Sequence, residues 1–366
     1  MNRQRVIIDR MYQSFKGCIF DDVPAIHQKE LIDFHKSAHG EHSLQQDVGF
    51  NHWLYQENTA NKRFYCYRDE QVVGQQSAME VELKMGDKII NAAYAIELWV
   101  RPEWKMKGLG VAMIGALIDR YDVLIGLGVS DDAHKMFKRQ GWLDLGMIDL
   151  LVKPLSLAGL SKRTAKTGIV RKLEYMAALV ASTLSNIFRR GTAKKSNFRK
   201  ITRFTDEHAK IVDEIYAQDV ITAKKKAEYF NWRFLKFPDK KAYEAYELVV
   251  ANEPTAFFVV KMTIWKGAQA LIISEIHARQ SDLGAIIDEI VALGVSKKVS
   301  MIIYQGLDEN IRRVLKSRLF FSHPGGERLL AYTKQPKFEP ILLNKKNWRI
   351  CDADSDVDLF LENDVY

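Results

Sequence analysis

The 366-residue sequence contains few cysteines and no long hydrophobic run. Its three cysteines, Cys18, Cys66 and Cys351, are far apart and odd in number. This argues against a disulfide framework or a zinc site and predicts a reducing, cytoplasmic location. No stretch reaches the roughly 18 apolar residues that a membrane-spanning helix needs. The N-terminus carries charges on both sides of a short apolar run, so we expect no signal peptide.

Acidic residues are almost absent from residues 151–200, which carry twelve Lys/Arg and the single acid Glu174. This segment has a balance of +11 while the whole chain has +8, so the rest of the sequence sums to −3. The basic character therefore belongs to one segment, and the overall charge does not predict general nucleic-acid binding. The nine histidines show no ligand spacing, and we expect no metal.

Residues 91–115 are the stretch around which the sequence is organised. Residues 93–100 are apolar and aromatic with one charge, Glu97, which predicts a central strand. Arg101-Pro102 ends this strand, because proline cannot donate to a strand ladder. From Leu109 onward, apolar residues recur at the helical period. A strand is thus expected to lead through a basic, glycine-containing turn into a helix.

The turn reads Lys105-Met106-Lys107-Gly108-Leu109-Gly110. Glycines let a ligand approach the backbone closely, and the first amides of a helix have no partner within the helix. Together with the positive end of the helix dipole and the two lysines, they predict a site for a phosphate or diphosphate. The alternative is that Gly108 and Gly110 only permit a tight turn, with no ligand.

The pattern Lys105-x-x-Gly108-x-Gly110 resembles the acyl-CoA signature of the GNAT acetyltransferase superfamily, with lysine in place of the usual Arg or Gln. A second block, GVSDDAHKMFKRQGW at residues 128–142, resembles the signature of the helix beside the acyl chain. The resemblance covers residues 10–152 and implies acyl-CoA as co-substrate. The contacts to CoA that it implies are made by Leu98, Val100, Lys105, Met106, Lys107, Gly108, Leu109 and Gly110.

The order of elements repeats from residue 198: helices, an antiparallel meander, a helix, a strand, a helix and a last strand at 329–333. The expected fold is α/β (α+β), with two tandem GNAT-like domains, each a mixed, mostly antiparallel sheet flanked by helices. The expected domains are 1–152 and 198–366. The second copy carries HARQSDLGA in place of the glycine turn, so we expect no CoA there.

Residues 153–197 form the expected basic connector between the two domains. Its apolar stretch, 175–188, predicts a helix that packs between the domains. A helix lying on an anionic membrane surface is the alternative, and would give at most peripheral membrane contact.

Three residues, Glu97, His134 and Tyr94, are candidates for catalysis. Glu97 is the only ionisable side chain between Tyr94 and Val100, and apolar surroundings are expected to raise its pKa, which suits a general base. The alternative is a carboxylate paired with Arg101. Strand alternation places Tyr94 and Leu98 on the face opposite Glu97 unless a bulge intervenes.

His134, at the start of the helix in the second block, is the other candidate base. Phe137 stands where the superfamily often carries a tyrosine that acts as the acid. The resemblance therefore implies no side-chain acid at that position, and the thiolate would leave unassisted or be protonated through water.

Over its full length the sequence resembles tandem-GNAT sugar N-acyltransferases of bacterial surface-polysaccharide (lipopolysaccharide, O-antigen) pathways. The segment NWRFLKFPDKK and the Trp348…Asp352-x-Asp354-x-Asp356 ending carry this resemblance. That group includes enzymes that transfer 3-hydroxybutyryl from CoA to a dTDP-linked amino sugar. The resemblance implies a nucleotide-linked amino sugar as the acceptor, with no nucleic acid as partner.

Three other classes of function would share some of these features. A Fem-type aminoacyl-tRNA-dependent transferase would share two GNAT-like folds and a basic connector, but would not need the CoA turn. A protein or thiol N-acetyltransferase would keep the turn and take a different acceptor. A nucleic-acid adaptor would depend on the basic connector alone.

Overall fold

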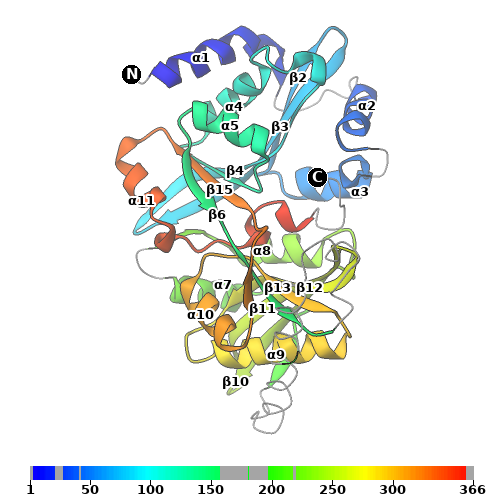
Figure 1. Ribbon diagram of the computed structural model, residues 1–366, viewed down its shortest axis with the longest axis vertical. Helices are drawn as coiled ribbons and strands as arrows, with labels where there is room; N and C mark the ends of the chain where they lie inside the picture. The colour runs from blue at the N-terminus through cyan, green and yellow to red at the C-terminus, as the bar shows by residue number, and fades with distance from the viewer. Residues whose placement is uncertain are drawn as a thin grey trace. The chain divides into compact units, whose positions relative to one another are not determined.

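A computed structural model describes residues 3–20, 28–40, 43–156, 180, 197–216 and 220–359 (Figure 1). The chain divides into two compact units. Unit 1 comprises Met1–Met147, Ile221–Lys224 and Glu327–Asn347. Unit 2 comprises Ile148–Val220, Lys225–Gly326 and Trp348–Tyr366. Each unit is built on its own mixed sheet, which confirms the expected α/β class with two sheets. No helix in the described residues is long and apolar enough to cross a membrane.

Unit 1 contains a sheet of eight strands among the described residues, in the order β1-β2-β3-β4-β5-β15-β6, with β9 paired to β3. The strands are β1 (Ile19–Phe20), β2 (Lys62–Arg68), β3 (Gln71–Met85), β4 (Lys88–Val100), β5 (Val123–Leu127), β6 (Leu143–Met147), β9 (Ile221–Ala223) and β15 (Arg328–Thr333). The helices are α1 (Arg3–Phe15), α2 (Gln28–His39), α3 (Val48–His52), the π-helical η4 (Trp53–Glu57), α4 (Leu109–Arg120), α5 (Asp131–Arg139) and α11 (Glu339–Leu343).

The predicted meander is confirmed by the antiparallel strands β2, β3 and β4. Asp69 and Glu70 join β2 to β3 with positive φ angles of 52° and 62°. Such a turn matches the right-handed twist of the two strands. The apolar pattern predicts two short strands, 72–74 and 79–85, but the structure has one continuous β3. Polar side chains that interrupt the apolar pattern, such as Gln75 and Ser77, are buried and hydrogen-bonded instead of marking a loop.

Helices α1 and α4 cover one face of this sheet. Their side chains form a core with the strands that includes Ile8, Leu109, Met113 and Ala93. The other face, at the β2–β4 end, packs against α2, where Phe34 meets Tyr65, Val72 and Trp99. Apolar burial at roughly 25 cal/mol per Å² holds both layers to the sheet.

Unit 2 contains seven strands among the described residues, in the order β14-β7-β13-β12-β11-β10-β8. They are β7 (Leu150–Pro154), β8 (Phe198–Lys200), β10 (Tyr243–Val250), β11 (Glu253–Trp265), β12 (Ala268–His277), β13 (Met301–Tyr304) and β14 (Phe321–His323). The helices are α7 (Asp206–Ile215), α8 (Ala227–Phe230), the π-helical η8 (Asn231–Leu235), α9 (Leu283–Ser296), α10 (Glu309–Ser317) and the short η11 (Asp352–Asp354).

Each sheet contains strands from the other half of the sequence: β9 and β15 in the first sheet, and β7 in the second. Strand β15 lies between β5 and β6 in the first sheet, and β7 lies between β13 and β14 in the second. The sequence placed 329–333 as the last strand of the second domain, which is wrong. The apolar pattern of residues 142–152 predicts one strand, but β6 ends at Met147 and β7 begins at Leu150 in the other sheet. The domain limits of 1–152 and 198–366 therefore differ from the two units.

Two other sequence-based expectations differ from the structure. The pattern of residues 222–234 predicts a helix, but β9 occupies its beginning because residues 221–223 pair with β3. The connector was expected to begin at residue 153, but Lys153 and Pro154 belong to β7. The predicted helix at 175–188 lies outside the described residues, apart from Val180.

Candidate active site

Strand β4 parts from β5 halfway along its length. The two strands pair in parallel from Ala92↔Val123 to Tyr94↔Ile125, and β4 then continues to Val100 without pairing to β5. The backbone of residues 95–100 therefore has an open side towards β5. A strand edge of this kind presents N–H and C=O groups that a ligand can use.

A β-bulge interrupts β4 in the same region. Ile96 pairs with Ser77, whereas the next pair is Trp99 with Gln75, so Glu97 and Leu98 together lie opposite Gln76 and β4 has one extra residue. Glu97 has a φ of +53°, in the left-handed region. A non-glycine residue held there costs of order 1–3 kcal/mol, and such strain is concentrated at functional sites.

The bulge changes the face to which Glu97 belongs. Ala93 and Ala95 pack with the α1/α4 core, and so do Leu98 and Val100 after the bulge. Glu97 instead contacts Ser77 and Gln75, on the opposite face. The sequence allowed Glu97 and Tyr94 to share a face only if a bulge intervened, and the bulge is present.

Three polar side chains hold one oxygen of the Glu97 carboxylate. The Tyr55 hydroxyl from η4 donates to Oε2, Gln75 Nε2 donates to it at 2.8 Å, and Ser77 Oγ donates at 3.1 Å. The other oxygen, Oε1, is buried and has no hydrogen-bond partner among the described residues. The carboxylate is thus fixed in place with one acceptor atom available.

Arg63 is the cation beside Glu97. Its guanidinium lies 3.6 Å from the centre of the Tyr55 ring and donates to Asn51 Oδ1. Burial tends to raise the pKa of Glu97, but Arg63 and the Tyr55 hydrogen bond outweigh it and hold that pKa below its usual value. The predicted raised pKa is therefore wrong, because the surroundings are charged and not apolar. The alternative partner, Arg101, donates its Nε to Val72 O at 2.7 Å instead.

Two histidines of α2 also belong to this cluster. Gln75 Oε1 can only accept, so His35 Nε2 donates to it across 2.6 Å. Burial, aided by Arg63, lowers the pKa of His35 to about 4, and burial also lowers the pKa of His39. Both rings are thus neutral near pH 7. No motif in the sequence marks this pair, Tyr55 or Arg63 as part of the site. Only the spacing of His35 and His39 by one helical turn could have pointed to a shared face.

The glycine turn has the expected local structure. Gly108 has a φ of +85° and precedes α4, and the bond from Ala112 N to Gly108 O, at 3.0 Å, is the first of the helix. The amides between these two residues have no partner within the helix. Lys105 and Lys107 are exposed, and Met106 is 98% exposed with a φ of +64°.

Packing also favours glycine at these positions. A Cβ on Gly108 would lie 2.6 Å from Met11 Sδ of α1, and one on Gly110 would lie 3.2 Å from Met136 Sδ of α5. Both glycines therefore serve the close approach of helices as well as the turn. The cradle for CoA phosphates stays a prediction.

His134 has its own partner, outside the Glu97 cluster. Its Nε2 lies 2.8 Å from Asp144 Oδ2 of β6, and Arg328 Nη1 lies 3.4 Å from the same oxygen. Partial burial tends to raise the pKa of Asp144, but the hydrogen bonds from His134 and Gly146 N outweigh it and hold that pKa below its usual value. Within the described part of the chain, His134 and Glu97 share no hydrogen-bond partner.

Phe137 and Tyr94 are both core residues. The ring of Phe137 stacks on Trp142 at 4.5 Å, so it is part of the packing beneath α5. Tyr94 is 2% exposed and ends the pairing with β5, at the point where the two strands part.

Solved structures of N-acyltransferases share this architecture. N-myristoyltransferase from Saccharomyces cerevisiae with bound myristoyl-CoA matches with a TM-score of 0.56 and 13% identity, over 86% of this chain and 78% of that one. A probable N-acyltransferase from Enterococcus faecalis gives 0.58 and 9%, over 86% and 71%. A GCN5-related N-acetyltransferase from Anabaena variabilis gives 0.56 and 10%, over 86% and 72%. The chain has the GNAT fold. Neither a protein-family model nor a curated protein sequence matches it.

The second GNAT-like sheet repeats the bulge, but its glutamate is paired with a buried lysine. Ile273 pairs with Val260 and Glu275 pairs with Val259, so Ser274 is the extra residue on β12. Glu275 receives a hydrogen bond from Lys225 Nζ and lies 2.8 Å from His277 Nε2. Burial would raise the pKa of Glu275, but Lys225 lowers it to about 2. Both oxygens of this carboxylate therefore have partners, whereas Glu97 Oε1 has none among the described residues.

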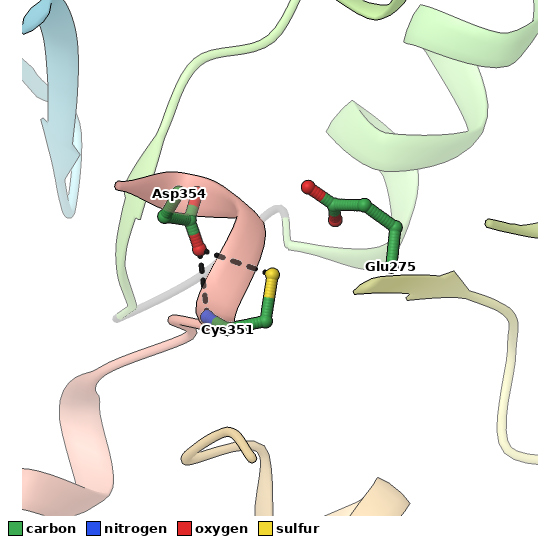
Figure 2. Close-up of side chains that lie close together, drawn as sticks. All are labelled: Glu275, Cys351 and Asp354. Carbon is green, nitrogen blue, oxygen red and sulfur yellow. Dashed lines mark hydrogen bonds between the residues drawn. The ribbon is translucent and has the colours of Figure 1, made fainter. Parts of the chain in front are cut away.

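Figure 2 shows Glu275 of β12 facing Cys351 and Asp354 from the η11 turn. Their ligand atoms lie within 4.8 Å of one another, a spacing that a metal ion could use. Lys225 Nζ, however, lies 2.7 Å from Asp354 Oδ1 as well as contacting Glu275. A fixed ammonium occupies the place between the two carboxylates and would repel a metal cation. This cluster is a buried ion-pair network.

Proposed function

We propose that the protein is an acyl-CoA-dependent N-acyltransferase whose chemistry takes place in unit 1. The observation that carries the proposal is Glu97, held at a strained bulge where β4 parts from β5, with one carboxylate oxygen unpartnered among the described residues. The neighbouring turn and the start of α4 would hold the CoA diphosphate through Lys105, Lys107 and the free amides. The GNAT fold and the bound myristoyl-CoA of one neighbour support this assignment.

The acceptor would enter as an amine. At neutral pH an alkyl amine is an ammonium ion, and Glu97 Oε1 would accept one of its hydrogens and then its proton. The neutral amine would attack the thioester carbonyl, while an N–H of β4 near residues 98–100 would stabilise the oxyanion. The thiolate of CoA would leave, and the attacking nitrogen would lose its second proton to solvent as the amide forms. Since Phe137 bears no hydroxyl, solvent would protonate the thiolate.

For the acceptor itself, we propose the amino group of a nucleotide-linked (dTDP) sugar, with an acyl chain such as 3-hydroxybutyryl. The resemblance of the second half and of the Trp348…Asp356 ending supports this choice, and the structural neighbours do not bear on it. With this acceptor the enzyme would act in the cytoplasm, in a surface-polysaccharide pathway.

Hydrogen exchange of the full chain with and without an acyl-CoA tests the location of the site. We expect added protection at 105–111 and along 95–100, and none at 278–284, the corresponding turn of unit 2. Protection of 278–284 alone would mean that CoA binds unit 2, and would contradict the proposed location. A chain that shows no protection and releases no CoA with any amine would contradict the proposed activity.

A further inference from the structure

Unit 2 contains a cavity of about 500 Å³, which lies in the usual size range of small-molecule sites. Its walls come from the segments that follow β12 and β13. Residues 278–280 continue from β12, and Asp308 and Asn310 begin α10 after β13. The end of α7 contributes Tyr216.

The cavity lies where two parallel strands separate. Pairing of β12 with β13 ends at Ile273↔Tyr304, although β12 continues to His277. This is the counterpart of the opening between β4 and β5 in unit 1. Each opening is followed by a turn and a long helix, α4 in one unit and α9 in the other. The second copy has therefore kept the opening of the fold.

Three features make this opening unsuitable for a phosphate or diphosphate. Asp282 precedes α9 and brings a negative charge to the helix start. Arg318 covers Gly284, since a Cβ there would lie 2.7 Å from Arg318 Nη2. At α10, Asp308 Oδ1 already accepts from the amides of Asn310 and Ile311, at 2.9 and 3.2 Å.

The charges on the cavity wall cancel in pairs. Arg279 Nη2 donates to Glu214 Oε2 at 2.6 Å, and Arg349 Nε lies 3.2 Å from Asp308 Oδ2. A ligand with a net charge would meet attraction and repulsion of similar size at this wall. Such pairs, together with the amide side chains of Gln280 and Asn310, offer both donors and acceptors.

We propose that unit 2 binds an uncharged, hydroxyl-rich small molecule in this cavity. Each hydroxyl both donates and accepts, so a polyol or neutral saccharide uses both members of each ion pair. Ile311, Leu283 and the ring of Tyr216 supply apolar surface for the carbon skeleton. The site binds without catalysing. Glu275 is the counterpart of Glu97, and both of its oxygens are held by Lys225 and His277.

Saturation-transfer NMR and titration calorimetry on the full chain test this proposal. The probes are methyl glucoside, methyl galactoside, N-acetylglucosamine and inositol. Asn310→Trp and Gln280→Trp place an indole in the cavity from two exposed positions on different walls. Lys316→Trp is the control, an exposed position of α10 that does not line the cavity.

We expect at least one probe to bind with one site per chain. Each cavity variant should weaken it by about tenfold or more, and Lys316→Trp should leave it within about twofold. Binding of none of the probes, binding that survives both cavity variants, or displacement of the probe by inorganic phosphate or CoA would each overturn the proposal. Because the readout is a neutral probe in unit 2, its failure leaves acyl transfer by unit 1 untouched.

Discussion

Gln75 Nε2 donates a 2.8 Å hydrogen bond to Oε2 of Glu97, although the residue opposite Gln75 in the strand register is Trp99. This contact exists because the bulge turns Glu97 towards the α2 face. In a regular strand the same carboxylate would point into the apolar core beneath α4, where an unpaired charge is costly. The position of the proposed base therefore depends on a β-bulge with one extra residue on β4.

Replacing Glu97 by Gln should remove the base while keeping the shape and the contacts at the other oxygen. We expect turnover to fall by roughly 10²–10⁴-fold, the usual effect of losing a general base. The affinity for CoA should not change, since the turn at 105–110 is intact. Thiol release from acyl-CoA measures the rate, and calorimetry measures the affinity. Glu82→Gln, an exposed residue of β3, is the control. Normal turnover of Glu97→Gln together with an inactive His134→Ala would move the base to α5.

Replacing Arg63 by Met should shift the acid limb of the pH–rate profile to higher pH. Arg63 lowers the pKa of Glu97, whereas burial raises it. Without the guanidinium the effect of burial is less compensated and the pKa of Glu97 rises, so Glu97 is protonated at a higher pH and activity is lost earlier on acidification. Lys62→Met, the adjacent position on β2, removes the same charge without removing this partner. An unchanged acid limb in Arg63→Met would mean that Glu97 does not set it.

Gly108→Ala should destabilise the protein by more than Gly86→Ala does. Both residues have positive φ, +85° and +60°, so alanine pays a conformational cost of about 1–2 kcal/mol at each. Only at Gly108 does the added Cβ also strike Met11, at 2.6 Å. This overpacking adds about 1–3 kcal/mol. Urea unfolding measures the difference. Met11→Ala in the Gly108→Ala background should recover the packing part, and no recovery would show that the strain lies elsewhere.

Lys105→Glu and Lys107→Glu should weaken CoA binding without affecting folding, since both side chains are exposed. Reversing a charge beside a diphosphate should reduce the affinity by about tenfold or more at low salt, and the loss should shrink as salt screens it. Titration calorimetry at two salt concentrations checks both effects. Lys36→Glu on α2 changes the net charge equally and serves as control. Equal losses in all three variants would indicate a general charge effect and not a diphosphate site.

Glu275→Gln should destabilise the protein at pH 7 by about 3 kcal/mol, because it removes a charge from a buried ion pair with Lys225. The pKa of Glu275 is lowered to about 2 from 4.5. A depressed carboxyl pKa stabilises the fold above pH 4.5, and this stabilisation is lost as the pH falls towards 2. The gap between wild type and variant should therefore close on acidification. Urea unfolding at pH 7, 4 and 3 measures it, and a constant gap would contradict the assignment.

The sequence by itself determined the local elements of the candidate site. Apolar periodicity and Pro102 predicted the central strand and its end, and Gly108 marked the turn before α4. These signals are local, since strand alternation, helical period and turn chemistry depend on neighbouring residues. The repeated order of elements in the second half likewise predicted a second sheet.

The tertiary structure alone decided the surroundings of Glu97 and the order of strands. Tyr55, Arg63 and Glu97 meet through pairing of separate strands and packing of η4, so no spacing in the sequence reveals the charge that lowers the pKa of Glu97. Strand β15 pairs with β5 across about 200 residues of chain. Its apolar pattern fits an interior position in either sheet, and only long-range pairing and packing select the first.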